Sequence, residues 1–102
     1  LAALGPRGDL VVVGRGTVVD AAALVDALRA DRIAGAGLDV LEGEPNVPPR
    51  LPELLQFDNV VVTPHCAGRA PEARTAATAL ILANLNAHFA GKPLPSPVSL
   101  KA

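Results

Sequence analysis

Short valine-rich runs constrain the fold of this 102-residue chain more than any other feature of its sequence. Leu10–Val13 and Val60–Val62 are uninterrupted apolar runs made almost entirely of valine. β-Branched side chains favour extended backbone, and a run without polar alternation is typical of a parallel strand that is buried on both faces. The small residues of Ile33–Val40 predict a further strand, at which another backbone comes close. The sequence therefore predicts three short strands of a parallel sheet.

Two helical segments alternate with these strands. Asp20 is a suitable N-cap for a helix that runs to about Arg29 or Asp31. Pro71 is suited to the first turn of a second helix, which ends near Ala90. Apolar residues recur at helical spacing in both segments, so each helix is expected to have an apolar face.

Proline-rich segments divide the rest of the chain. Residues 41–59 contain four prolines and are predicted to form a long irregular loop, a kind of segment that is often functional. Residues 92–102 contain three prolines and are predicted to form an extended tail. The order strand, helix, strand, loop, strand, helix is typical of an α/β parallel sheet. Because two helices cover such a sheet poorly, we expect a piece of a larger doubly wound sheet; the alternative is a small independent α/β domain.

The composition argues against several classes of partner. Nine basic and ten acidic residues are interspersed and give a formal charge of −1, whereas a nucleic-acid or anionic-membrane surface requires a basic patch. The longest apolar stretch, residues 76–85, is too short to span a bilayer. The single cysteine, Cys66, permits no internal disulfide, so we expect a reducing, cytoplasmic compartment. The chain begins at Leu1 without a signal-peptide pattern, which is expected of a fragment or a processed product.

Polar side chains follow each predicted strand at its carboxyl end. Arg15 follows the first strand. Asp39 and Glu44 follow the second strand, and His65 follows the third. Carboxyl ends of parallel strands share one edge of the sheet, and ligands of open α/β sheets bind there. We therefore expect these side chains to converge at one site, although they are far apart in the sequence.

Residue types alone leave structural and functional interpretations open for this site. Arg15, between two glycines, is either a solvated loop residue or a guanidinium that binds a carboxylate through two hydrogen bonds. Glu44 is either ordinary loop charge or a functional carboxylate, and His65 is either a structural histidine or a proton donor. Asp39 either caps a turn or belongs to the site, and Cys66 is predicted to be a buried small residue. No cysteine–histidine cluster has zinc-like spacing and no G-x-G-x-x-G motif occurs, so we expect no metal site.

Three motifs occur in order along the chain: GRGTVVD from Gly14, GAGLDV followed by EP at Glu44, and TPH ending at His65. Together they resemble the D-isomer-specific 2-hydroxyacid dehydrogenases, strongly from Leu4 to Gly68 and more weakly through GKPLPSPV. The EPNVP and GKPL segments are most similar to the glyoxylate, hydroxypyruvate and 2-ketogluconate reductases of that family. The resemblance implies that residues 1–91 are the C-terminal part of a Rossmann-like NAD(P)-binding domain, an α/β fold with a parallel sheet and a C-terminal helix. Residues 92–102 would be its tail.

The resemblance also implies a catalytic set. Arg15 would hold the substrate's carboxylate and carbonyl oxygen. His65 would be the general acid that protonates this oxygen as hydride reaches the carbon, and the general base in the reverse direction. Glu44 would hydrogen-bond His65, orient it and favour its protonated form.

The cofactor-binding positions carried over from the family lie in the same segments. Asp39 matches the position that contacts the nicotinamide carboxamide. Gly14 and Gly68 match backbone positions that line the nicotinamide end of the cleft, where Arg15 and His65 are also expected. The family's phosphate-binding glycine loop and ribose selector lie upstream of the matched stretch. The choice between NAD and NADP therefore stays open, and the isolated chain is expected to be inactive.

The implied function is hydride transfer between NAD(P)H and a small 2-oxoacid or D-2-hydroxyacid, by a full-length protein expected to be a homodimer. One alternative is a non-catalytic binding protein similar to the C-terminal-binding corepressors, and another is a structural or oligomerisation fragment.

Two departures from the family pattern concern substrate identity more than the reaction. They are Val12 in place of a polar residue and CAGRAPEA after TPH.

Overall fold

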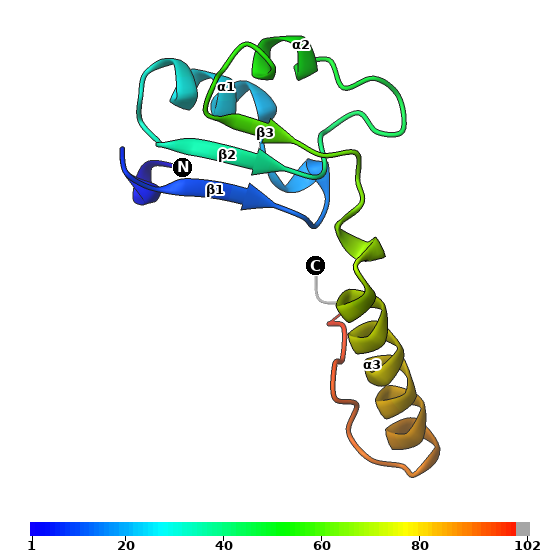
Figure 1. Ribbon diagram of the computed structural model, residues 1–102. Helices are drawn as coiled ribbons and strands as arrows, with labels where there is room; N and C mark the ends of the chain where they lie inside the picture. The colour runs from blue at the N-terminus through cyan, green and yellow to red at the C-terminus, as the bar shows by residue number, and fades with distance from the viewer. Residues whose placement is uncertain (100–102) are drawn as a thin grey trace. The chain divides into compact units, whose positions relative to one another are not determined.

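Residues 1–66 form one structural unit and the residues from Ala67 onward form a second, in a computed structural model that describes residues 1–99 (Figure 1). The first unit contains a parallel sheet with strands β1 (Asp9–Val12), β2 (Gly35–Leu38) and β3 (Val60–Val62) in that order. β1 and β3 both pair with β2. The predicted strands and their parallel arrangement are therefore confirmed.

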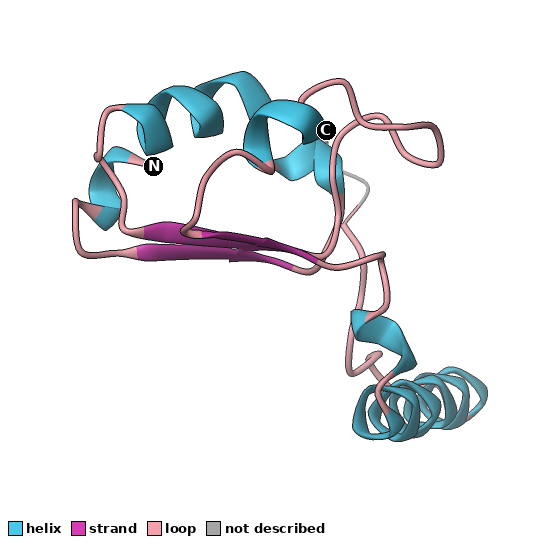
Figure 2. Cartoon of the chain, turned by 45° about the horizontal axis from the view of Figure 1, so that its top comes forward, coloured by secondary structure: helices cyan, strands magenta, loops and turns pink. Residues whose placement is uncertain are grey.

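The helices of the first unit lie on one face of this sheet (Figures 1 and 2). α1 (Ala21–Arg29) begins where predicted, because the Asp20 carboxylate accepts a hydrogen bond of 3.0 Å from the Ala23 backbone N–H. A short helix, α2 (Leu51–Leu54), interrupts the segment that was predicted to contain no regular element. That prediction was wrong because Pro52 lies in the first turn of α2, where no backbone N–H is required.

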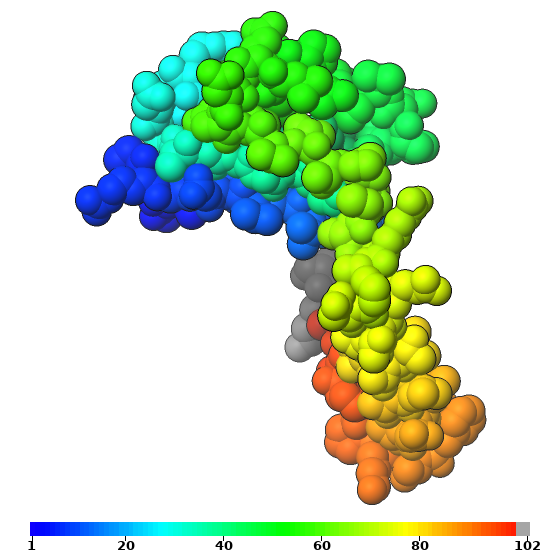
Figure 3. Space-filling model, in the orientation of Figure 1, coloured from blue at the N-terminus to red at the C-terminus, as the bar shows by residue number. Residues whose placement is uncertain are grey.

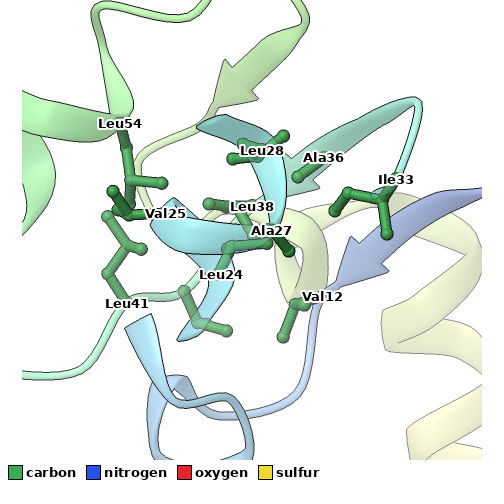
Figure 4. Packing of buried hydrophobic residues seen from close by; sticks show 11 residues of the cluster. Val12, Leu24, Val25, Ala27, Leu28, Ile33, Ala36, Leu38, Leu41 and Leu54 are labelled. Carbon is green, nitrogen blue, oxygen red and sulfur yellow. The ribbon is translucent and has the colours of Figure 1, made fainter. Parts of the chain in front are cut away.

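The core of the first unit lies between the sheet and these helices, as Figure 4 shows. Leu24 and Val25 of α1 and Leu54 of α2 are its most deeply buried large side chains. The space-filling view shows the residues around α2, in green, packed over α1, in cyan (Figure 3). The proline-rich segment therefore contributes to the core as well as to the loop.

The opposite face of the sheet is open in the first unit. Val11 and Val61 are 70% and 64% exposed, whereas Val12 is 6% exposed. The prediction that these strands are buried on both faces was wrong for residues 1–66, because successive strand side chains point to opposite faces and both helices of this unit cover the same one. The apolar side chains on this second face are thus not covered by any element of residues 1–66.

The second unit consists of a short turn, η3 (Ala67–Arg69), a long helix, α3 (Pro71–Phe89), and the segment that follows. The predicted helix is confirmed, with Pro71 in its first turn. The Asn84 side chain donates to the Ser96 hydroxyl at 2.7 Å, which holds part of the tail beside the helix. Residues 100–102 of the predicted tail lie outside the described residues. Among the helices of residues 1–99, none has the length and apolar character needed to cross a membrane.

The burial of α2 yields a stability prediction. Leu54 is 0% exposed and its neighbour Leu55 is 62% exposed, so the two leucines form a matched pair. Leu54→Ala should lower the free energy of unfolding by about 2–5 kcal/mol because it leaves a cavity in the core. Leu55→Ala should change it by less than about 0.5 kcal/mol. Urea unfolding followed by circular dichroism measures both, and equal effects would contradict the core position of α2.

Candidate active site

Hydrogen bonding continues beyond the carboxyl ends of the strands and brings the following loops together. The Asp39 backbone N–H donates to the Val12 carbonyl oxygen at 2.9 Å, and the Thr63 N–H donates to the Leu38 carbonyl oxygen at 2.9 Å. The loops that follow all three strands therefore leave the sheet at one edge. This is the edge at which the predicted site residues were expected to converge.

Glu44 and His65 are in direct contact at this edge. The His65 Nδ1 atom lies 2.6 Å from Glu44 Oε2, and the two side chains are 47% and 30% exposed. The other Glu44 oxygen, Oε1, accepts a hydrogen bond of 2.7 Å from the Leu41 backbone N–H. The carboxylate is therefore held by its own loop on one side and meets the imidazole on the other. The expected hydrogen-bond distance between Glu44 and His65 is present.

This environment favours the ionised form of Glu44. The hydrogen bond from the Leu41 N–H, and after it the contact with His65, hold the pKa of the Glu44 carboxyl below its ordinary value of 4.5. Desolvation of the carboxyl group opposes this shift and ranks below both hydrogen bonds. Glu44 is therefore an anion at neutral pH, placed against one nitrogen of the imidazole.

Arg15 shares a surface depression with this pair. It precedes a single turn, η2 (Gly16–Val18), and its guanidinium donates to the Gly14 carbonyl oxygen at 3.1 Å. Arg15, Glu44 and His65 all line a depression of about 350 Å³. A cation, an anion and an imidazole thus face one small volume.

Gly16 sets the distance between the loops that carry Arg15 and Glu44. A Cβ atom at position 16 would overlap with the carbonyl group of Leu41 and the backbone nitrogen of Glu42. The two loops therefore touch backbone to backbone, next to the N–H that binds Glu44. Only glycine permits this approach.

Asp39 has a different environment from the other charged residues of the site. It is 5% exposed, and its Oδ1 atom accepts hydrogen bonds from the Thr63 hydroxyl at 2.6 Å and from the Cys66 backbone N–H at 2.9 Å. The carboxylate therefore caps the turn that contains His65, which was one of the two interpretations open from sequence. Cys66 is half-buried, not buried as predicted, because its thiol lies at this turn, 3.6 Å from Asp39 Oδ1.

The two predicted glycine positions lie in different units. A Cβ atom added at Gly14 would meet no atom within 4 Å, so the surface next to Arg15 is open. Gly68 lies in η3 of the second unit, and it also has open space at its Cα atom. The predicted role of Gly68 stays a prediction.

A larger depression, of about 540 Å³, lies away from these residues. It is formed by η1 (Ala2–Leu4), β1 and α1, and its lining includes Leu10, Val19 and Ala27. None of the predicted site residues lines it. We assign the candidate site to the smaller depression because the groups that can bind a carboxylate and transfer a proton face it. In residues 1–99, no group of three or more side chains is arranged to hold a metal ion.

Comparison with known proteins shows the family of the chain. The family described as D-isomer specific 2-hydroxyacid dehydrogenase, NAD binding domain, matches residues 1–67. The chain belongs to this family. A hydroxyphenylpyruvate reductase of Plectranthus scutellarioides is 50% identical to this chain over 96 residues, which are 94% of the chain and 30% of the relative.

Solved structures give the same result. An NADPH-dependent glyoxylate/hydroxypyruvate reductase from Sinorhizobium meliloti, in complex with NADP and malonate, is 50% identical with a TM-score of 0.61, over 96% of this chain and 30% of that one. A D-lactate dehydrogenase with NAD⁺ from Lactobacillus jensenii is 30% identical with a TM-score of 0.63, over 96% and 33%. The three parallel strands are thus part of a Rossmann-type NAD-binding domain. The chain spans about a third of the length of these proteins.

The lowered pKa of Glu44 can be measured directly. We expect its carboxyl carbon to titrate below 4.5 in ¹³C NMR spectra. The pKa of Glu44 is lower in the folded protein than in the unfolded chain. Ionised Glu44 therefore stabilises the fold at pH values above its unfolded-state pKa, and this contribution is lost as the pH falls through its folded-state pKa.

His65→Ala provides the control for this titration. The Leu41 hydrogen bond remains in this variant, so the Glu44 pKa should rise only part of the way and stay below 4.5. A full return to 4.5 would show that Leu41 is not the principal partner.

Proposed function

We propose that the chain is the C-terminal part of an NAD(P)-dependent D-2-hydroxyacid dehydrogenase that reduces a small 2-oxoacid such as glyoxylate or hydroxypyruvate. The observation that carries this proposal is the 2.6 Å contact between Glu44 and His65, at the depression that Arg15 also lines. The similarity to reductases of this kind supports the choice of substrate class. We expect the full-length protein to be a cytoplasmic homodimer.

Arg15 binds the substrate in this proposal. Its planar guanidinium can donate two parallel hydrogen bonds to the substrate's carboxylate, and a further N–H can reach the carbonyl oxygen. The open backbone at Gly14 leaves room beside it. Arg15 thereby fixes which face of the carbonyl group is turned toward the cofactor.

His65 supplies the proton. Its Nδ1 atom meets Glu44, so Nε2 is the nitrogen that can donate to the carbonyl oxygen of the substrate. Glu44 orients the ring and stabilises the positive charge of the protonated imidazole. The carbonyl oxygen gains the proton from His65 as the carbon gains hydride, and the product is the 2-hydroxyacid. In the reverse direction His65 accepts the hydroxyl proton.

A nicotinamide cofactor supplies the hydride when it is bound. Asp39 is proposed to contact the carboxamide because it matches the family's position for this contact, although its carboxylate is 5% exposed and its Oδ1 atom already accepts hydrogen bonds from Thr63 and Cys66. The open space at Gly14 suits a flat ring. Arg15 and His65 are proposed to line the nicotinamide end of the cleft, and the cofactor-binding role of Gly68 stays a prediction from the resemblance. The dinucleotide can be NAD or NADP, since the residues that select between them are expected outside the matched stretch.

The acid–base role of His65 is testable in the full-length protein. His65→Ala should lower kcat/KM with glyoxylate or hydroxypyruvate by roughly 10²–10⁴-fold, because the general acid is lost. His88→Ala is the matched control, since His88 lies in the last turn of α3, and it should leave the rate unchanged. Unchanged turnover in His65→Ala would overturn the assignment. Absence of reduction by the unmodified protein would favour a binding or structural function.

The carboxylate-binding role of Arg15 gives an independent test. Arg15→Lys keeps the charge but loses the two-pronged geometry, so KM for the 2-oxoacid should rise roughly 10–100-fold, as expected for the loss of a charged hydrogen bond. Arg29→Lys is the control, because Arg29 forms exposed ion pairs with Asp26 and Glu53 on α1 and α2. Steady-state kinetics measures both, and an unaltered KM in Arg15→Lys would remove Arg15 from the substrate site.

A further inference from the structure

We propose that Thr63 is a positioning residue for His65, acting through the buried carboxylate of Asp39. Neither its residue type nor its place in the TPH motif had suggested a role. This inference rests on the proposed function, because it concerns how the general acid is held. Thr63 itself is not expected to contact substrate.

The hydrogen bonds around the turn support this role. The Thr63 hydroxyl and the Cys66 N–H both donate to Asp39 Oδ1, at 2.6 and 2.9 Å, so one oxygen atom joins the two ends of the turn. Within the turn, the His65 N–H donates to the Thr63 carbonyl oxygen at 3.0 Å. Asp39 is itself anchored to β1 by its N–H, which donates to Val12. The turn is therefore tied to Asp39, the residue that follows β2, and through Asp39 to β1.

His65 needs such support because of its backbone conformation. Its φ angle is +51°, in the left-handed region that residues with a Cβ atom adopt only at an energetic cost. A conformation of this kind persists only where surrounding contacts impose it. The hydrogen bonds from Thr63 and Cys66 to Asp39, on either side of His65, are those contacts.

The conformation of the turn determines where the imidazole lies. Glu44 reaches the His65 ring from a different loop and is held separately by Leu41. If the turn relaxes, the ring moves relative to both Glu44 and the depression that Arg15 lines. A displacement of about 1 Å can cost roughly 10²-fold in rate, so the Thr63 hydroxyl is predicted to affect kcat without contacting the reacting atoms.

Three threonine variants of the full-length protein test this proposal. Thr63→Val preserves the shape of the side chain and removes the hydroxyl, and it should lower kcat roughly 10–100-fold with little change in KM. Thr63→Ser keeps the hydroxyl and should restore most of kcat. Thr78→Val is the matched control, because the Thr78 hydroxyl donates to the Arg74 carbonyl oxygen within α3, and it should have no effect. A wild-type kcat in Thr63→Val, or failure of Thr63→Ser to restore it, would overturn the proposal.

An NMR measurement separates this inference from the proposed function. In Thr63→Val the ¹⁵N signals of the His65 ring should change as the contact with Glu44 is disturbed, while those of Thr63→Ser should match the unmodified protein. This readout decides the positioning role even if the unmodified protein reduces no 2-oxoacid, which would refute the proposed function alone. If Thr63→Val does not fold, amide exchange in the unmodified protein decides. Slow exchange of the Cys66 N–H is expected, and rapid exchange would overturn the proposal.

Discussion

Parallel pairing of three short strands is the constraint on which the rest of this structure depends. The pairing extends past the strand ends, where the N–H groups of Asp39 and Thr63 donate to the strand beside them. Each of the following loops therefore starts from a fixed position. Side chains that are distant in the sequence meet within a few residues of the sheet, and the loops need little regular structure of their own.

The sequence predicted the parts of the fold that depend on local preference. Valine runs predicted β1 and β3, and a capping aspartate and a proline in a first turn predicted the starts of α1 and α3. It failed at α2, where several prolines in one segment concealed a single helical turn that is stabilised by the burial of Leu54. It also failed on the second face of the sheet, because burial depends on what covers a strand as well as on its own side chains.

The candidate site was predictable only in outline. The placement of Arg15, Glu44 and His65 after successive strands followed from topology, and their roles followed from resemblance. The hydrogen-bond partners that hold these side chains could not be predicted from the sequence. The donor to Glu44, for example, is the backbone N–H of Leu41, which any residue except proline would supply. The left-handed backbone at His65 and the hydroxyl of Thr63 also gave no signal, since both acquire meaning only once Asp39 is seen beneath the turn.

The contact at Gly16 has a consequence for how such a site can diverge. The loop that carries Arg15 and the loop that carries Glu44 meet backbone to backbone, so neither can change its path alone. Altered substrate range would therefore arise more readily from side chains on the rim of the depression, or from other parts of a longer protein. A designer who grafts one of these loops onto another scaffold would have to transfer the other with it.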